Sequence, residues 1–330
     1  MGLLALVACE SDERPSVESS SPTSTSTESP PSTSGGSDPS TTSTTPGDLT
    51  GTIVFDDFED LYTMSADATD LRQLTTLAGS EFDGAFSPDG RFIVYRDSRR
   101  GINDDDEIYI MDADGSSPRN LTNDPANDWG PDWSPDGEWI AFNSDRDGGR
   151  IAGYLVRPDG TDLRRIDADV WVEYPSFSPD GTSIVFMGHT GSDYDIFVAD
   201  IATGSATRLT DAPGADGWPA WSPDGEWIAF TTERDDCTRT DEGAECGTSD
   251  QPGEFHDIWL MRPDGSEQHR VTLEIGQFVA WSPDSTRLLI SGHTLFVVGL
   301  DGSGRIELQP EGLPYAPGGI PDWTAGSTSP

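Results

Sequence analysis

The sequence contains no lysine, and its 19 basic residues are all arginine. Asp and Glu together number 60, which gives a formal net charge of −41 at pH 7. Because a protein of this charge is repelled by phosphate backbones and by anionic lipid headgroups, the composition argues against binding to nucleic acid. We therefore expect cationic or neutral partners.

Several sequence patterns of catalysis are also missing. The chain has no P-loop and no dinucleotide-binding fingerprint. It has no Gly-x-Ser-x-Gly nucleophile elbow, which argues against an α/β-hydrolase. Beyond the first residues, no apolar stretch approaches the length of a membrane-spanning helix. These absences favour a binding protein over an enzyme, without excluding an enzyme that uses scattered acids or histidines.

A short motif recurs throughout the rest of the chain. It is an aromatic residue followed by Ser-Pro-Asp-Gly, or by a close variant, and its aromatic position falls at Phe86, Trp133, Phe177, Trp221, Trp281 and Trp323. The intervals run from 42 to 60 residues, and three of the five lie between 44 and 47. A period near 45 residues with several short strands in each unit is typical of a β-propeller.

Each repeat reads as four short strands. Pro fixes φ for the first corner of a type I turn, Asp suits the second corner, and Gly accepts the positive φ that follows. An apolar second strand comes next, as at Ile140–Phe142, and then a β-branched and aromatic third strand, as at Ile108–Met111. A fourth strand ends in Leu-Thr or similar, as at Leu121-Thr122. One such sheet buries both faces only when it packs between two neighbours.

The sixth unit is split between the two ends of the sequence. Trp323 has no second, third or fourth strand after it, whereas Thr52–Phe55, Leu61–Met64 and Leu71–Thr75 have no first strand before them. We therefore predict an all-β fold: a six-bladed β-propeller of four-stranded antiparallel blades over residues 50–324, with a ring closed by N- and C-terminal strands. Residues 325–330 are expected to form a disordered tail.

This pattern resembles the WD40-like (PD40) repeats of TolB-type six-bladed β-propellers. The resemblance rests on Trp-Ser-Pro-Asp-Gly-x-x-Ile-Ala-Phe, Ile-Tyr-x-Met-Asp-x-Asp-Gly and Leu-Thr, and it covers residues 51–324. It implies the fold strongly and the function weakly, because the same blades serve both as binding platforms and as parts of enzymes.

The N-terminal residues predict export. Leu6-Val7-Ala8-Cys9 matches a bacterial lipobox, in which Cys9 becomes the lipidated N-terminus, so residues 1–9 are interpreted as a signal remnant. No Lys or Arg precedes Cys9, so we expect the true start to lie upstream. Residues 10–49 are rich in Ser, Thr and Pro and are expected to form a disordered tether. The prediction is an extracytoplasmic protein that is lipid-anchored to the bacterial cell membrane.

The two other cysteines lie nine positions apart in one insertion. Cys237 and Cys246 are expected to form a disulfide, because the protein is expected to be exported. Closing so short a loop contributes roughly 2–3 kcal/mol in the chain-entropy model.

The connections between strands divide into two kinds. The first-to-second and third-to-fourth turns are short Asp-Gly turns and share one face of the ring. The other connections vary greatly, and they include the insertion Glu233–His256. Variable loops on a rigid scaffold usually carry binding. Near the expected tunnel mouth they hold the candidate binding residues Phe82, Asp83, Asp128, Trp129, Trp171, Glu173, Tyr174, Asp216, Trp218, Phe278 and Tyr315. The rings either fill blade junctions or form an aromatic, acidic cup for a sugar, a peptide or a cationic segment.

One loop is dense in carboxylates. Asp104, Asp105, Asp106 and Glu107 could supply several of the six to eight oxygens that Ca²⁺ prefers, although the spacing is not that of an EF-hand. The other interpretation is a solvated acidic loop, and no other cofactor is expected. His189 and His293 occupy equivalent places in two repeats, so repetition alone accounts for them.

The sequence thus favours a monomeric, non-catalytic cell-surface lipoprotein whose propeller binds a protein or glycan of the cell envelope. The alternative is a carbohydrate-active lyase or hydrolase that uses acids or His on the loop face with a divalent metal. Some propellers related to TolB, the oligogalacturonate lyases, bind a metal through His residues, but their motif context is not reproduced in this sequence.

Overall fold

The computed structural model describes residues 47, 49–76, 79–98, 106–189, 191, 193–234, 237–240, 243–246, 257–272, 276–292, 294–313 and 317–326. All of them lie in a compact unit that spans residues 43–330. Among the predicted features, Cys9, residues 10–46 and 48 of the tether, Asp104, Asp105, His256, His293 and Tyr315 fall outside the described residues. Within the part described, no helix is long and apolar enough to cross a bilayer.

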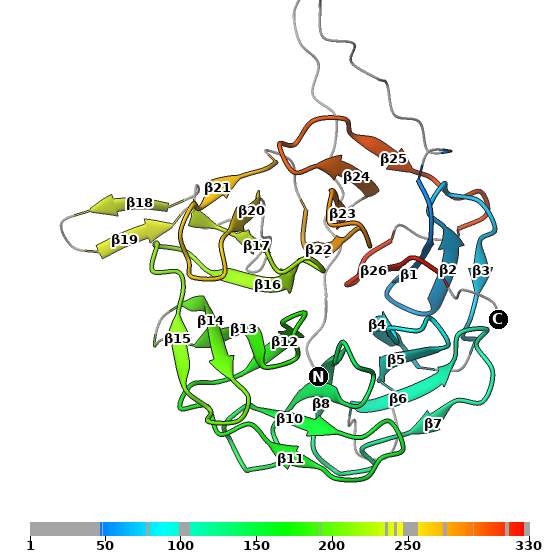
Figure 1. Cartoon of the computed structure of the whole chain (residues 1–330), viewed down its shortest axis with the longest axis horizontal. Coiled ribbons are helices and arrows are strands. Elements are labelled where there is room, and N and C mark those ends of the chain that lie inside the picture. The colour runs from blue at the N-terminus through cyan, green and yellow to red at the C-terminus, as the bar shows by residue number, and fades with distance from the viewer. Residues whose placement is uncertain are drawn as a thin grey trace, which may run out of the picture. The chain divides into compact units, whose positions relative to one another are not determined.

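Six four-stranded antiparallel sheets form a ring, as predicted (Figure 1). We number these sheets blades I to VI. Blade I contains β26 (Asp322–Thr324), β1 (Thr52–Asp56), β2 (Leu61–Ser65) and β3 (Arg72–Gln73). Blade II contains β4 (Glu81–Phe86), β5 (Phe92–Asp97), β6 (Glu107–Asp112) and β7 (Arg119–Asn120). Blade III contains β8 (Asp128–Trp133), β9 (Ile140–Ser144), β10 (Ala152–Val156) and β11 (Arg164–Arg165).

The other three blades repeat this order. Blade IV contains β12 (Glu173–Phe177), β13 (Ser183–His189), β14 (Tyr194–Asp200) and β15 (Ala206–Arg208). Blade V contains β16 (Asp216–Trp221), β17 (Ile228–Thr232), β20 (Asp257–Met261) and β21 (His269–Arg270). Blade VI contains β22 (Phe278–Trp281), β23 (Arg287–Ser291), β24 (Leu295–Gly299) and β25 (Ile306–Leu308).

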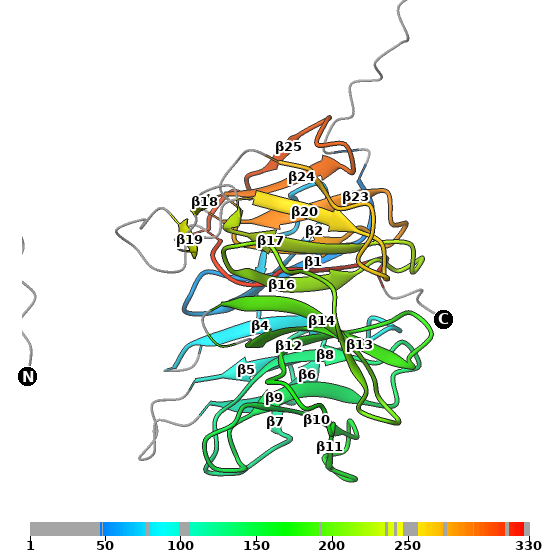
Figure 2. The same ribbon diagram turned by 90° about the vertical axis from the view of Figure 1, so that its left-hand side faces the viewer.

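A separate hairpin, β18 (Cys237–Thr240) and β19 (Gly243–Cys246), interrupts blade V between β17 and β20. Both views show it standing off the ring (Figures 1 and 2). Cys237 and Cys246 are paired directly opposite each other in its ladder. That backbone register is compatible with the predicted disulfide, because paired residues of an antiparallel ladder lie within the Cα separation that a disulfide spans. The disulfide itself stays a prediction.

The core lies between the blades. The described residues form six buried apolar clusters, and each cluster is drawn from two adjacent blades. The second strands show why these strands are apolar on both faces: Ile53 and Phe55 pack toward blade VI, whereas Val54 packs toward blade II. Alternate residues of a strand point to opposite faces, so a sheet with two neighbours needs a continuous apolar run.

Chain termini close the ring, which confirms the predicted shared blade. β26 pairs with β1 through the register Ile53↔Trp323. The Trp323 indole donates a hydrogen bond from Nε1 to the Thr50 carbonyl oxygen at 2.9 Å. This pairing removes two open strand edges that would otherwise be exposed to other chains.

The recurring motif residues stabilise the blades through side-chain hydrogen bonds to the backbone. In the Ser-Pro-Asp-Gly turn of blade III, Ser134 Oγ donates to Asp136 Oδ1 at 2.6 Å and accepts the Trp139 N–H at 2.9 Å. Gly137 adopts the expected positive φ of 69°. At the end of the fourth strand, Thr122 Oγ1 accepts the Ile108 N–H at 3.1 Å, which explains the recurring Leu-Thr.

Candidate functional site

A bulge in the innermost strand of four blades shapes the centre of the ring. The register of β4, β8, β12 and β16 shifts between the fourth and the first residue before the motif aromatic. At the third residue before the aromatic, φ is positive in all four: Asp83 (55°), Gly130 (61°), Tyr174 (50°) and Trp218 (44°). Such values are costly for bulky residues, at about 1–3 kcal/mol each, and a bulge re-aims the side chain.

Proline follows this strained position in several blades. Pro131, Pro175 and Pro219 fall within the bulges, where the ladder has no partner for them. Proline has no N–H to donate, so inside a sheet it is tolerated at such places. The proline at this position is therefore a local sequence signal for the bulge.

The innermost strands enclose a tunnel cavity of about 420 Å³. Its walls come from all six blades, with Asp83, Tyr174, Trp218 and Ile320 at the bulge level. A second level of the wall is formed by residues that lie one position before the motif aromatics, namely Asp132, Ser176 and Asp322. A cavity of this volume falls in the range of sites that bind small molecules or single peptide side chains.

Three predicted aromatic residues are in contact around this cavity. Tyr174 and Trp218 line it, and their ring centroids are 5.8 Å apart. Phe278 meets Trp218 edge-on at 5.0 Å. We call Tyr174, Trp218 and Phe278 the aromatic arc, and it spans blades IV, V and VI. All three residues are half-buried, so each keeps part of its surface accessible, and as binding residues they stay predictions.

The other predicted aromatics lie outside this arc. Trp171 stacks on His189 with ring centroids 5.1 Å apart, and His189 meets Tyr194 edge-on at 5.2 Å. Trp129 is half-buried and does not line the cavity among the described residues. Trp171 and Trp129 both stay predictions as binding residues.

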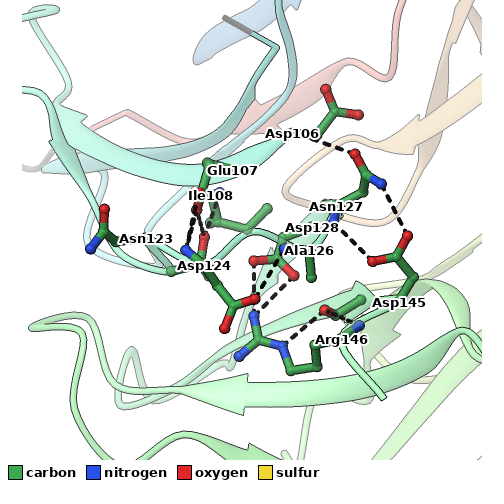
Figure 3. A network of polar contacts seen from close by, with 12 residues as sticks. Asp106, Glu107, Ile108, Asn123, Asp124, Ala126, Asn127, Asp128, Asp145 and Arg146 are labelled. Carbon is green, nitrogen blue, oxygen red and sulfur yellow. Dashed lines mark hydrogen bonds and ion pairs between the residues drawn. The ribbon is translucent and has the colours of Figure 1, made fainter. Parts of the chain in front are cut away.

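Two of the predicted acids are engaged inside the protein. Asp128 is fully buried, and Nη2 of Arg146 donates to both of its oxygens, at 3.0 and 2.9 Å (Figure 3). Asp216 is fully buried in the equivalent place, and Arg234 Nη2 donates to its Oδ2 at 2.9 Å. Breaking such a buried pair typically costs 3–5 kcal/mol. Asp128 and Asp216 thus hold the ends of the first and second strands together and are not offered to a ligand in this structure.

A sequence signal for these two pairs exists. Each arginine follows two residues after the end of the second strand, in Ser144-Asp145-Arg146 and Thr232-Glu233-Arg234. The repetition of an acid and an arginine at equivalent places in two blades indicates a pair. The acids alone predict a binding surface, whereas the acids together with these arginines indicate internal ion pairs.

Glu173 differs from the paired acids. It is 7% exposed, its Oε1 accepts no hydrogen bond among the described residues, and the Tyr194 side chain donates to the carboxylate. Burial raises the pKa of Glu173 to about 7. It lies in β12 immediately before Tyr174, and thus next to the aromatic arc.

The described members of the predicted calcium loop already have protein partners. Asp106 Oδ2 lies 2.8 Å from Arg96 Nη2, and its backbone N–H donates to Asn127 Oδ1 at 3.3 Å. Glu107 accepts a hydrogen bond from Thr122 Oγ1. It also accepts one from the Asp124 N–H (Figure 3). Across the described residues, no group of three or more His, Cys, Asp or Glu is arranged to hold a metal ion. With Asp104 and Asp105 undescribed, Ca²⁺ binding stays a prediction.

Two tunnel acids were missing from the predicted site. Asp132 and Asp322 directly precede motif tryptophans, and each reaches across a blade junction. Asp132 Oδ2 accepts the Phe177 N–H at 2.9 Å, and Asp322 Oδ2 accepts the Phe86 N–H at 2.8 Å. Burial and the neighbouring Asp322 carboxylate raise the pKa of Asp132 to about 7. The repeated Pro-Asp-Trp at 131–133 and 321–323 is the only sequence signal that distinguishes them.

Comparison with known proteins identifies the kind of propeller. Residues 168–239 match the family model PD40, described as the TolB beta propeller domain. In this segment the chain is similar to that family, and the ring has six blades. TolB from Acinetobacter baumannii superposes on 83% of this chain and 66% of its own, with a TM-score of 0.64 and 18% sequence identity. At that identity, the similarity establishes the fold alone.

Sequence relatives share shorter stretches with this chain. An uncharacterized protein of Agrobacterium fabrum is 32% identical over 124 residues, which are 38% of this chain and 36% of that protein. The Tol-Pal system protein TolB of Francisella tularensis subsp. mediasiatica is 31% identical over 99 residues, which are 30% of this chain and 19% of that protein. The matched segments thus span about a third and about a fifth of these two relatives.

Proposed function

We propose that this protein is a non-catalytic module of the bacterial cell envelope that binds a partner protein at the opening of its tunnel cavity. The observation that supports this most directly is the aromatic arc. Tyr174 and Trp218 are held in costly backbone conformations beside a cavity, and strain of this kind concentrates at functional sites. Matches to TolB propellers, one of them named as a Tol-Pal system protein, support an envelope protein as the partner.

The arc has the chemistry of a binding anchor. Large aromatic residues with one apolar face and a polar handle dominate protein interfaces, and truncating one can cost 2 kcal/mol or more of binding. The Tyr174 and Trp218 rings lie with their centroids 5.8 Å apart, and Phe278 meets Trp218 edge-on at 5.0 Å, so the three rings support one another before any partner binds. Such preorganisation lowers the entropy lost on association.

The experiment is capture of partners from a solubilised envelope fraction by immobilised protein, with a glycan array in parallel. We expect wild type to retain a protein, and Trp218→Ala and Tyr174→Phe/Trp218→Ala to lose it. The control is Asp159→Asn/Asp264→Asn, two exposed turn carboxylates whose hydrogen bonds to the backbone an amide oxygen can keep. Retention of glycans alone would replace the protein partner by a sugar. Equal loss in the control would place the binding surface elsewhere.

A lipid anchor is the finer part of the proposal. Cys9 would attach the chain to the outer side of the cytoplasmic membrane or to another envelope membrane, and residues 10–49 would hold the propeller away from the lipid. Support comes from the lipobox and from the Ser/Thr/Pro-rich composition. Metabolic labelling with a fatty-acid analogue should mark the wild type and not Cys9→Ser. A labelled Cys9→Ser protein would contradict the anchor.

A further inference from the structure

The charge of the tunnel cavity is of one sign. Three carboxylates line it, those of Asp83, Asp132 and Asp322. Among the described residues that form its wall, none is Arg or His. The remaining wall is apolar or aromatic, with prolines from several blades. A concave, largely apolar site with few polar groups of one charge selects its ligand by that charge.

Asp83 lies at the bulge level, and one of its carboxylate oxygens can still accept a hydrogen bond. It is 8% exposed, and its Oδ2 accepts no hydrogen bond among the described residues. The Arg96 guanidinium is the cation near it, with Nη1 3.9 Å from that oxygen, whereas Nη2 is held by Asp106 at 2.8 Å. Burial raises the pKa of Asp83 although Arg96 opposes the shift. The Asp83 carboxylate is therefore only partly compensated.

Asp132 and Asp322 form the second charged level. In each residue, Oδ2 accepts a hydrogen bond from a backbone N–H of the next blade. Asp132 Oδ1 also accepts the Trp133 N–H at 2.8 Å. Both residues are partly exposed and line the cavity, so their exposed part faces its interior. Burial and the Asp322 carboxylate both raise the pKa of Asp132, and a cation between the two levels would relieve the repulsion between these acids.

We propose that the tunnel cavity receives one cationic side chain, Arg or Lys, of the partner protein. The charged group would lie between Asp83 and the pair Asp132 and Asp322, and its alkyl stem would pass Tyr174 and Trp218. This inference rests on the proposed function, because the cation is carried by the protein that the aromatic arc binds. Arg and Lys suit the site since both combine an apolar stem with a charged end, and Arg also packs on aromatic faces.

The probe is Nα-acetyl-arginine amide, and the matched control ligand is Nα-acetyl-citrulline amide, which has the same shape and no charge. Binding is measured at low salt by quenching of tryptophan fluorescence. We expect saturable binding of the arginine probe, and binding at least about tenfold weaker for the citrulline probe. Raising the salt concentration should weaken the arginine probe alone.

The variants are Asp83→Asn and Asp132→Asn/Asp322→Asn. Asparagine keeps an oxygen for the Phe177 and Phe86 N–H groups, so the fold is retained, and circular dichroism checks it. Each variant should bind the arginine probe at least about tenfold more weakly, whereas Asp159→Asn/Asp264→Asn should bind it like wild type.

Several results would overturn the inference. Equal binding of the two probes would show that charge does not matter, and unchanged binding by Asp83→Asn and by the double variant would place the cation elsewhere. A melting temperature raised by Ca²⁺ alone through these carboxylates, with no binding of the arginine probe, would make the cavity a metal site.

The capture experiment separates this inference from the proposed function. If the partner protein is retained equally by wild type, Asp83→Asn and Asp132→Asn/Asp322→Asn, the binding function stands and the cation site is wrong. The arginine probe could also bind while Trp218→Ala and Tyr174→Phe/Trp218→Ala retain the same proteins as wild type. In that case the proposed function is wrong, and so is the inference that a partner protein supplies the cation.

Discussion

Truncating Trp323 should destabilise the whole ring. Trp323 lies in β26, the three-residue strand that the C-terminal part of the chain adds to blade I. It is 6% exposed and packs in a cluster with Ile53, Phe55 and residues of blade VI. Its indole also donates to the Thr50 carbonyl. Trp323→Ala therefore removes packing and a hydrogen bond at the position where the two ends of the ring meet.

The size of the effect follows from general magnitudes. Truncating a buried Trp to Ala costs about 3–5 kcal/mol of unfolding free energy. For a domain of this size, each kcal/mol lowers the melting temperature by about 2–4 °C. We therefore expect Trp323→Ala to lower the melting temperature by about 10 °C. Trp323→Phe keeps most of the packing and loses the Nε1 donor, so it should cost about 1–2 kcal/mol.

Differential scanning calorimetry measures this directly, with Trp171→Ala as the control because Trp171 is only half-buried and lies outside the closure. Deleting residues 320–330 should destabilise the protein at least as much as Trp323→Ala, since it removes β26 entirely. An unchanged melting temperature in Trp323→Ala, or a decrease no larger than that of Trp171→Ala, would show that the pairing of β26 with β1 does not hold the ring closed.

Three further predictions concern groups in other parts of the chain. Because the folded-state pKa of Asp132 is raised to about 7 from 3.8, the contribution of Asp132 to stability is complete below about pH 4 and is lost as the pH rises toward 7. The melting temperature should therefore fall by a few degrees over that range, and it should fall less in Asp132→Asn. An equal fall in both proteins would contradict the raised pKa of Asp132. Cys237 and Cys246 should be recovered by mass spectrometry as one linked peptide that reduction splits, and full alkylation of both thiols without reductant would disprove the link. Gly319→Ala should lower the melting temperature by several degrees because an added Cβ would overlap the buried Asp56 carboxylate. Gly299→Ala is the reference, because Gly299 also has no positive φ and its added Cβ meets no atom nearer than Asp301 Oδ1 at 3.2 Å. A decrease no larger than that of Gly299→Ala would contradict the prediction.

Much of the fold could be predicted from the sequence because its signals are local. The Ser-Pro-Asp-Gly turn specifies its own conformation, and Ser134 and Asp136 are bonded to each other and to backbone a few residues away. The strand after it begins with the apolar run Ile140–Phe142 and is buried at every position, since both of its faces are covered. Repetition of such a unit near every 45 residues leaves a ring of blades as the arrangement that buries them all.

The candidate site could be predicted only in part. The sequence located the aromatic arc, because Tyr174, Trp218 and Phe278 stand at equivalent places on the variable face. It could not distinguish acids that are neutralised inside the protein, such as Asp128 and Asp216, from acids that face the cavity. The distinction depends on whether an arginine side chain reaches the carboxylate, and composition near the acid does not reveal that.

The sequence by itself thus determined the blades, their turns and the closure of the ring, because each depends on contacts within one repeat or on a missing strand at each end. Only the tertiary structure decided which side chains form the tunnel wall. A bulge of one extra residue shifts the alternation of inward and outward side chains, and the partner of Asp322, the Phe86 N–H, is 236 residues away along the chain. The cavity is acidic because the innermost strands of different blades bring Asp83, Asp132 and Asp322 together around the axis of the ring. No single repeat contains that arrangement.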